Sequence, residues 1–254
     1  LLHRATRGGH GISHVAGLSR ARLEDLVRDV ESSGQHLPPR LIPSAELTSI
    51  VADAIALAES LDPAGLESLL RRNVARYGIV TFIDTVAAPF LREVGDAWHA
   101  GRLSISQEHL ATAVVERVVG DAAPLLTGSD GSPVIVIGTL EGERHAGGAL
   151  MAAATAASEG WRVIYLGADV PAKGIIETAG KTQARAVGIS VVFPDRKSKV
   201  SAQIREIQEG LPSETTLLVG GAGAGELRQA LRKSGIEFVE TMSELHEKLS
   251  RMRL

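Results

Sequence analysis

The carboxy-terminal half of the chain alternates short β-branched runs with helical patterns, and this alternation is the strongest constraint on its fold. Strands are predicted at Val134–Thr139, Arg162–Leu166, Ala186–Val191, Thr216–Val219 and Glu237–Val239. Helices are predicted between and after them, at about 146–159, 171–181, 197–210, 224–234 and 243–251. Strands joined by helices form a parallel sheet with right-handed crossovers, because only helices on both faces can cover it. The pattern therefore predicts a Rossmann-type α/β domain with a five-stranded parallel sheet over residues 133–254.

An all-α segment is predicted before this domain, over residues 44–127. Ser44 is expected to cap its first helix, and Asp62-Pro63 to start the second. A third helix is predicted at about 81–100, and a fourth, capped by Ser104 or Ser106, is predicted to extend to about residue 125. Helices of this length with short connections favour an antiparallel four-helix bundle.

The first 33 residues are predicted to form short helices, and two linkers divide the chain. Residues 1–22 carry four arginines, three histidines and no acid, so this patch could contact DNA phosphates or be a solvated helical face. The linkers are the proline-containing stretches Ser33–Pro43 and Thr127–Pro133. The chain begins at Leu1, so we expect it to be part of a longer protein.

Composition excludes several classes of protein. The formal net charge of −3 gives the whole molecule no strong attraction to nucleic acid or to a membrane surface. No apolar run is long enough to span a bilayer, and no secretory signal is visible, so we expect a cytoplasmic protein. The absence of cysteine excludes disulfides, thiolate metal sites and thioether-linked chromophores.

The loop after the first predicted strand carries a candidate metal ligand, His145. Ligands of open α/β sheets bind beyond the carboxyl ends of the strands, which is where this loop lies. Glu143, two residues earlier, can fix the tautomer of the imidazole, as carboxylates do for metal-bound histidines. The alternative is a solvated polar loop with an incidental histidine.

A second cluster lies where the third and fourth bundle helices meet. Trp98 and His99 end one helix, and Glu108 and His109 lie in the first turn of the next, with a turn at Gly101 between them. A large aromatic beside histidines and a carboxylate could form a lid over a planar ligand. The alternatives are a core position for Trp98 and a helix-dipole partner for Glu108.

Later strands end in small residues that could admit a bulky ligand. Ser190 ends the third strand, and Gly220-Gly221 follow the fourth. A dinucleotide fingerprint is excluded because the first loop lacks G-x-G-x-x-G. The full phosphate-loop motif G-x-x-x-x-G-K-[ST] and a Ser-His-Asp arrangement are also missing, so we do not expect an enzyme.

Together the two clusters resemble a known family. The run from Glu143 through His145 to Gly148 resembles the acidic-x-His-x-x-Gly motif of cobalamin (B12)-binding domains, with Ser190 and Gly220-Gly221 at the positions of the later serine and double glycine. Trp98 followed by Glu108-His109 is similar to the pattern of the cobalamin-dependent, MerR-type light-responsive regulators. Those photoreceptors join a helical bundle to a flavodoxin-like cobalamin domain, behind a DNA-binding module. Here residues 1–33 resemble only the last helices of a MerR-type module.

The resemblance implies specific roles. His145 would be the lower axial ligand of cobalt, with Glu143 as its hydrogen-bond partner. Ser190, Gly220 and Gly221 would line the slot for the displaced nucleotide tail. Trp98 and Glu108 would cover the upper face, where the adenosyl group of adenosylcobalamin sits. His99 would replace that group after light breaks the cobalt–carbon bond.

The resemblance also implies partners and leaves alternatives. A light sensor of this kind would change its homo-oligomer or its contact with a protein partner, and it would bind DNA only with a complete amino-terminal module. One alternative is a corrinoid methyl-carrier protein, which shares the bundle-plus-sheet plan. Another is a photoreceptor that holds a non-covalent bilin in addition to cobalamin.

Overall fold

The computed structural model describes residues 43–122, 131–192, 197–231 and 235–253. Residues Pro43–Leu254 form one compact unit. The helical segment predicted at residues 1–33 lies outside the described residues. No described helix is both long and apolar enough to cross a membrane.

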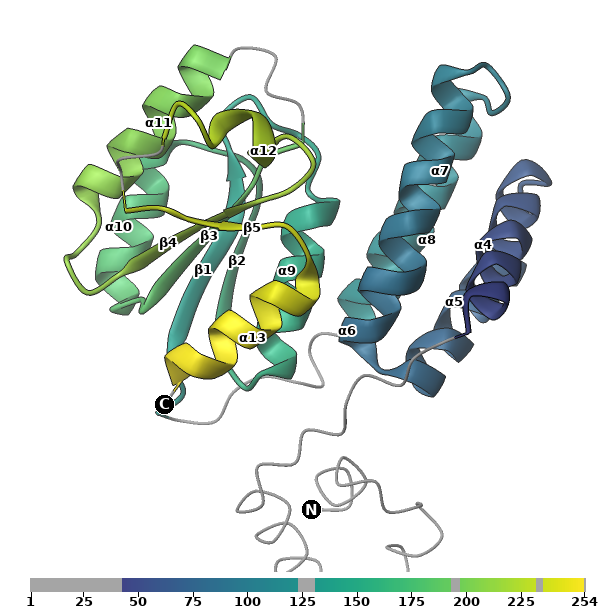
Figure 1. Cartoon of the computed structure of the whole chain (residues 1–254), viewed down its shortest axis with the longest axis horizontal. Coiled ribbons are helices and arrows are strands. Elements are labelled where there is room, and N and C mark those ends of the chain that lie inside the picture. The colour runs from purple at the N-terminus through teal and green to yellow at the C-terminus, as the bar shows by residue number, and fades with distance from the viewer. Residues whose placement is uncertain (1–42, 123–130, 193–196, 232–234, 254) are drawn as a thin grey trace, which may run out of the picture. The chain divides into compact units, whose positions relative to one another are not determined.

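The first part of this unit is the predicted helical bundle (Figure 1). Its long helices are α4 (Ser44–Glu59), α5 (Pro63–Tyr77), α7 (Ala88–His99) and α8 (Ile105–Ala122). They share one apolar core, whose largest fully buried side chains include Phe82, Phe90, Leu66 and Leu70. Burial of these side chains, rather than helix propensity, supplies most of the stability of such a bundle.

Local capping sets where the bundle helices begin. The Asp62 side chain accepts a hydrogen bond from the Gly65 backbone N–H (2.9 Å), as predicted for the start of α5. Ser104, one of the two predicted caps of α8, forms a reciprocal capping box with Gln107. The prediction for Ser44 was wrong: Pro43 occupies the cap position and makes no side-chain bond.

The predicted third helix is continuous but contains a π-helical turn. Gly78, with φ of 78°, separates α5 from a short helix α6 (Ile79–Phe82), which is followed by a π-helix η1 (Ile83–Ala87) and then by α7. Pro89 in the first turn of α7 has no N–H to donate to the carbonyl four residues earlier. The wider π turn accommodates this loss, since Ala88 N–H bonds to the Ile83 carbonyl five residues back.

The second part is a five-stranded parallel sheet in the order β2-β1-β3-β4-β5. The strands are β1 (Val134–Leu140), β2 (Arg162–Val170), β3 (Ala186–Ser190), β4 (Thr216–Gly220) and β5 (Glu237–Val239). This is the flavodoxin-like order, so the predicted fold class is confirmed. β2 is longer than predicted, and register shifts in its pairing with β1 on either side of Gly138 accommodate the extra residues.

Helices cover both faces of the sheet (Figure 1). The helices α9 (Gly147–Ser158) and α13 (Met242–Arg253) pack together on one face, where Trp161 is fully buried and donates to the Leu249 carbonyl. On the other face lie α10 (Ala172–Thr182) and α11 (Lys197–Gly210). The helix predicted at 224–234 is a single turn, α12 (Ala224–Leu227), and turn conformation follows it.

The bundle and the sheet domain are in direct contact. Met151 and Ala154 of α9 belong to the apolar core of the bundle, and α9 packs against α6 and α8. The first residues of α13 contact α6 and η1. The side of α9 away from the sheet is therefore covered by bundle helices.

The ion pair between His246 and Glu159 predicts a pH-dependent stability. His246 Nδ1 lies 3.0 Å from Glu159 Oε1. The hydrogen bond to Glu159 raises the pKa of His246 above its ordinary value of 6.5, against the effect of burial, and the charges of Glu159, Glu247 and Asp84 raise it further. A group whose pKa is raised on folding stabilises the folded state below its unfolded pKa, and this contribution is lost as pH rises through the folded pKa.

We therefore expect His246→Gln to lower the free energy of unfolding at about pH 5.5 by up to about 1 kcal/mol, and by less at about pH 8.5. Urea unfolding of both proteins at the two pH values measures this difference. An equal loss at both values would show that the His246 charge contributes nothing.

Candidate functional site

The side chain of Glu143 organises the loop after β1. It is buried, with 8% of its surface exposed. Its Oε1 accepts from the His145 backbone N–H (2.9 Å) and lies 2.5 Å from His145 Nδ1, and its Oε2 accepts from the Val192 backbone N–H (3.0 Å). A buried carboxylate needs such donors, because its desolvation is otherwise costly. One side chain thus connects the loops that follow β1 and β3.

The backbone of the same residue is also held. The Glu143 carbonyl accepts hydrogen bonds from Thr139 Oγ1 (2.6 Å) and from the Asp169 N–H (3.0 Å). The Asp169 carboxylate in turn accepts from the Gly142 N–H (2.7 Å). The end of β2 therefore fixes the position of the loop, and with it the direction of the His145 side chain.

His145 is exposed and lies two residues before the first residue of α9. Because Nδ1 faces a carboxylate, Nε2 is the ring nitrogen placed to ligate a metal, as in carboxylate–histidine–metal arrangements. The arrangement suits a neutral imidazole that donates one electron pair to a transition metal.

Behind the histidine, small residues from three strand ends meet. Register pairs Thr139 of β1 with Ser190 of β3, and Ser190 with Gly220 of β4, so these ends lie side by side at one edge of the sheet. A Cβ on Gly148 would lie 2.5 Å from Ser190 Oγ. The buried Ser190 hydroxyl has no hydrogen-bond partner among the described residues. A buried polar group left unpaired in this way points to an absent partner such as a ligand.

The backbone conformation and close packing at position 221 require glycine. Its φ is +99°, and a Cβ there would lie 2.3 Å from the Val191 carbonyl oxygen. The β4 loop therefore approaches the β3 loop backbone to backbone. The predicted residues Glu143, His145, Gly148, Ser190, Gly220 and Gly221 are thus brought to one edge of the sheet by the structure.

The second predicted cluster lies where α7 ends and α8 begins. The Trp98 and His99 rings meet edge to face with centroids 4.6 Å apart, and Trp98 is 41% exposed, so it is not a core residue. His99 Nδ1 lies 2.8 Å from the Gly95 carbonyl. Because a carbonyl only accepts, Nδ1 carries the proton, and Nε2 of the neutral ring bears the lone pair.

On the next helix, Glu108 pairs with His109 and also accepts from Thr112 Oγ1 (3.0 Å). Gly101, with φ of +71°, makes the turn between the two helices. Among the described residues, no hydrogen bond or ion pair joins Trp98, His99, Glu108 or His109 to the Glu143–His145 pair. The two clusters therefore remain separate groups on the bundle and on the sheet domain.

Two further residues near the first cluster were not predicted. Glu116 Oε1 lies 3.7 Å from the place of a Cβ on Gly147, at the start of α9. Burial raises the pKa of Glu116, and the charge of Glu108 raises it further; burial and Glu116 in turn raise the pKa of Tyr165 on β2. The sequence signal was the spacing of Glu108, Thr112 and Glu116, which places them on one helix face.

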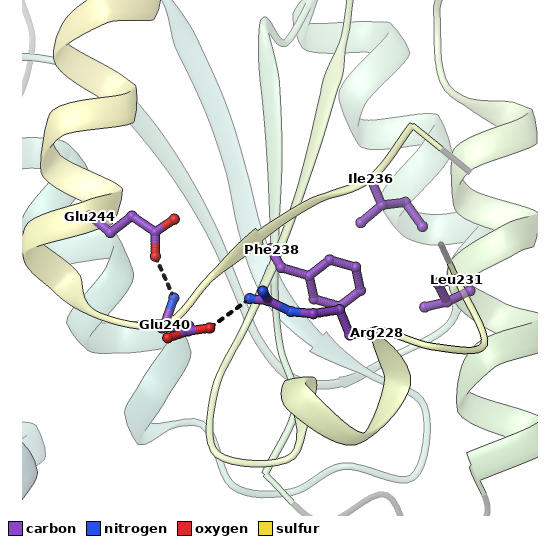
Figure 2. Close-up of a pocket in the computed structure, with 6 residues that line it drawn as sticks. All are labelled: Arg228, Leu231, Ile236, Phe238, Glu240 and Glu244. Atoms are coloured by element: carbon purple, nitrogen blue, oxygen red, sulfur yellow. Dashed lines mark hydrogen bonds and ion pairs between the residues drawn. The ribbon is translucent and has the colours of Figure 1, made fainter. Parts of the chain in front are cut away.

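A pocket of about 470 Å³ lies elsewhere, beside β5 (Figure 2). It is lined by Arg228, Leu231, Ile236, Phe238, Glu240 and Glu244. Arg228 extends across it, over the Phe238 ring and into an ion pair with Glu240 (2.8 Å). Three strand spacings, roughly 14 Å, separate β1 from β5, so this pocket is not the site of His145.

Among the described residues, no three histidine, aspartate or glutamate side chains gather in a way that could hold a metal ion by themselves. The candidate site instead offers one oriented imidazole beside a cradle of small residues. That combination suits a metal that arrives within a large ligand. Fold and site together define a protein of the bundle-plus-Rossmann class with a side chain of a metal-ligating type, His145, oriented at the carboxyl end of β1.

Comparison with known families agrees with this class. Models of the B12 binding domain match residues 133–244 and, for a second model, residues 51–120. The chain belongs to the B12-binding family that includes the transcriptional repressor CarH, and it is a cobalamin-binding protein. The resemblance to the cobalamin-dependent regulator family, predicted from the sequence motifs, is confirmed.

Curated relatives fall into two groups. The HTH-type transcriptional repressor CarH of Myxococcus xanthus is 30% identical over 226 residues, which cover 88% of this chain and 73% of the repressor. The dimethylamine corrinoid protein of Methanosarcina barkeri is 31% identical over 146 residues, which cover 56% of this chain and 68% of that protein. Sequence similarity alone does not separate the two groups.

Among solved structures, the monomethylamine corrinoid protein of Methanosarcina barkeri has a similar fold. It superposes with a TM-score of 0.63 at 16% identity, over 80% of this chain and 98% of that one. At this identity the likeness concerns the fold only. None of these comparisons supports the additional bilin that was considered from sequence.

The contact at Gly221 predicts a strict requirement for glycine. We expect Gly221→Ala to destabilise the fold by at least about 2 kcal/mol, because it adds a positive-φ strain to a collision with the Val191 carbonyl. Gly225→Ala is the matched control, since nothing lies within 4 Å of a Cβ at that position. Urea unfolding measures both variants, and equal midpoints for the two would contradict the contact.

Proposed function

We propose that this chain binds adenosylcobalamin and acts as a light sensor that regulates an oligomer, a protein partner or, with a complete amino-terminal module, DNA. The observation that carries the proposal is the pairing of His145 with the buried Glu143 beside small residues and the buried Ser190 hydroxyl, which is unbonded within the described part of the chain. The exposed Trp98–His99 pair on the bundle supports the choice of a light sensor over a carrier.

The residues of the cradle fit a corrinoid bound through a histidine. Ser190 would give its buried hydroxyl, which lacks a partner among the described residues, to the displaced nucleotide tail. Gly148, Gly220 and Gly221 would lie beside that tail. A Cβ on each would lie, respectively, 2.5 Å from Ser190 Oγ, 3.1 Å from the Val239 carbonyl oxygen and 2.3 Å from the Val191 carbonyl oxygen, so the missing side chains let these loops pack closely together. These are the positions at which the family motif has small residues.

His145 would serve as the lower axial ligand through Nε2. Glu143 would keep the proton on Nδ1 and hold the ring in one orientation, and its own bond to the Val192 N–H prevents it from following the histidine. Such oriented ligands bind with less loss of side-chain entropy. The Glu143 contacts therefore prepare the site before the cofactor arrives.

Trp98 and Glu108 would cover the upper face. When bound, adenosylcobalamin supplies a cobalt–carbon bond that light cleaves. The indole of Trp98 offers an exposed apolar surface, and Glu108 is oriented by Thr112 and His109. His99, with Nδ1 held by Gly95, presents Nε2 as the replacement ligand. Differential contacts of these side chains in dark and light would shift the bundle relative to the sheet domain.

A second candidate is a corrinoid methyl-carrier protein. It is favoured by the 31% identity to the dimethylamine corrinoid protein and by the fold shared with the monomethylamine corrinoid protein. A carrier must leave the upper face open to methyl donors and acceptors. The Trp98–His99 and Glu108–His109 pairs at the end of the bundle favour the covered face of a sensor instead.

The lower-ligand role is tested by reconstitution with adenosylcobalamin in the dark. We expect the wild-type absorption spectrum to show the benzimidazole displaced by an imidazole, and His145→Ala to lose that signature because it removes the imidazole that Glu143 orients. His109→Ala is the control for removing an imidazole and should keep it. A normal spectrum in His145→Ala would refute the assignment.

The sensor and carrier functions are separated by light. We expect illumination of the reconstituted protein to change its spectrum and its size on gel filtration, and Trp98→Ala to weaken retention of adenosylcobalamin. His99→Ala should still respond to light but lack the spectrum of a protein that has gained an upper imidazole. An unchanged spectrum and size, together with methyl transfer to a thiol from bound methylcobalamin, would favour the carrier.

A further inference from the structure

We infer that Asp84 holds the bundle to the sheet domain by capping helix α13, and that it thereby positions Trp98 and His99. Asp84 lies in the π-helix η1 of the bundle. Its Oδ1 accepts from the Met242 N–H (2.8 Å), and its Oδ2 accepts from the Ser243 N–H (2.7 Å) and from the Ser243 hydroxyl. The positioning part of this inference rests on the proposed function; the contact itself does not.

The amino-terminal N–H groups of α13 show what Asp84 contributes. A helix leaves its first N–H groups without partners inside the helix. The third of these, on Glu244, bonds to the local cap Thr241 (3.0 Å). The first two, on Met242 and Ser243, bond only to Asp84 among the described residues. The cap of α13 is therefore complete only when the bundle is in place.

The π turn explains why Asp84 can reach α13. Four apolar neighbours, Ile83, Val86, Ala87 and Phe82, are buried in the bundle core, whereas Asp84 is only half-buried. In η1 the backbone hydrogen bonds span five residues instead of four, so the side chains within the turn lie at different angles around the helix axis than in a regular α-helix. One face can then fill the core while Asp84 projects toward the sheet domain. π turns of this kind recur at functional positions.

Asp84 and the predicted upper-face residues belong to one helical run. α6, η1 and α7 follow one another without a break from Ile79 to His99. Fourteen residues from Asp84 to Trp98, at the rise of an α-helix, span roughly 21 Å. A rotation of about 10° at Asp84 would move Trp98 by roughly 4 Å over this length. A fixed contact at Asp84 thus limits where Trp98 and His99 can lie.

The contact is tested with the two tryptophans of the chain, which report on different parts. Trp98 lies on α7, and Trp161 is fully buried in the sheet domain. Single-tryptophan backgrounds, Trp161→Phe and Trp98→Phe, follow each part separately by fluorescence during urea unfolding of the cofactor-free protein. We expect the two midpoints to coincide when Asp84 is present and to separate in Asp84→Ala, with the bundle and sheet domain unfolding independently.

Thr241→Ala is the matched control. It removes the local cap of the same helix and leaves the Asp84 bonds intact, so both midpoints should fall together. Asp84→Asn keeps one carbonyl oxygen as an acceptor and should give a smaller separation than Asp84→Ala. Coincident midpoints in Asp84→Ala, lowered no more than in Thr241→Ala, would overturn the inference.

Positioning is tested by titration with hydroxocobalamin, followed by absorbance. If Asp84→Ala leaves about a tenth of molecules with the bundle in place, the Kd should rise about tenfold. Thr241→Ala should bind as the wild type does, so a general loss of stability cannot account for the effect. An unchanged Kd in Asp84→Ala would overturn the positioning role. Failure of the wild type to bind would refute the proposed function, and the tryptophan experiment would still decide the contact.

Discussion

The buried carboxylate of Glu143 is the interaction on which the candidate site depends. It is removed from water, and it is tolerated there because three N–H groups, two of them backbone amides, surround it. Those donors come from two loops, so the position of His145 follows from the packing of β1 against β3. The geometry of the site is thus set by the sheet, and the position of the His145 side chain is fixed by the strands that precede the two loops.

Much of the sheet domain could be predicted from sequence, because the central strands are mostly apolar runs between turn signals. The flavodoxin-like strand order was implied by the family resemblance, and the gathering of Ser190 and Gly220 at one edge follows from the parallel arrangement of the strands. The length of β2 could not be predicted. Its last residues are held by the Asp169 contacts to Glu143 and Gly142, which are tertiary and leave no periodicity in the sequence.

The bundle shows where local patterns mislead. The apolar spacing from 81 to 100 is that of one regular α-helix, yet the π-helix Ile83–Ala87 lies within this stretch. Pro89 was the one visible warning of a departure from regular hydrogen bonding. Ser44 has a side chain suited to capping a helix, but the preceding residue, Pro43, occupies the N-cap position, so Ser44 is the first residue of the helix. The contact of Trp98 with His99 lies within α7 and that of Glu108 with Thr112 lies within α8, so these pairings follow from local sequence spacing.

The two outer strands of the sheet are each built in a way that discourages fibril-like self-association. β5 has only three residues, and its Glu237 is paired with Lys248 at 2.8 Å, so a foreign strand would find little length to bond and a charge in the way. β2 is long, but its pairing is irregular on either side of Gly138, and Gly167 and Asp169 have positive φ. A bent, irregular border of this kind is a poor template for strand addition. A protein whose sheet has two unpaired edge strands can in this way avoid aggregation through strand pairing at high concentration.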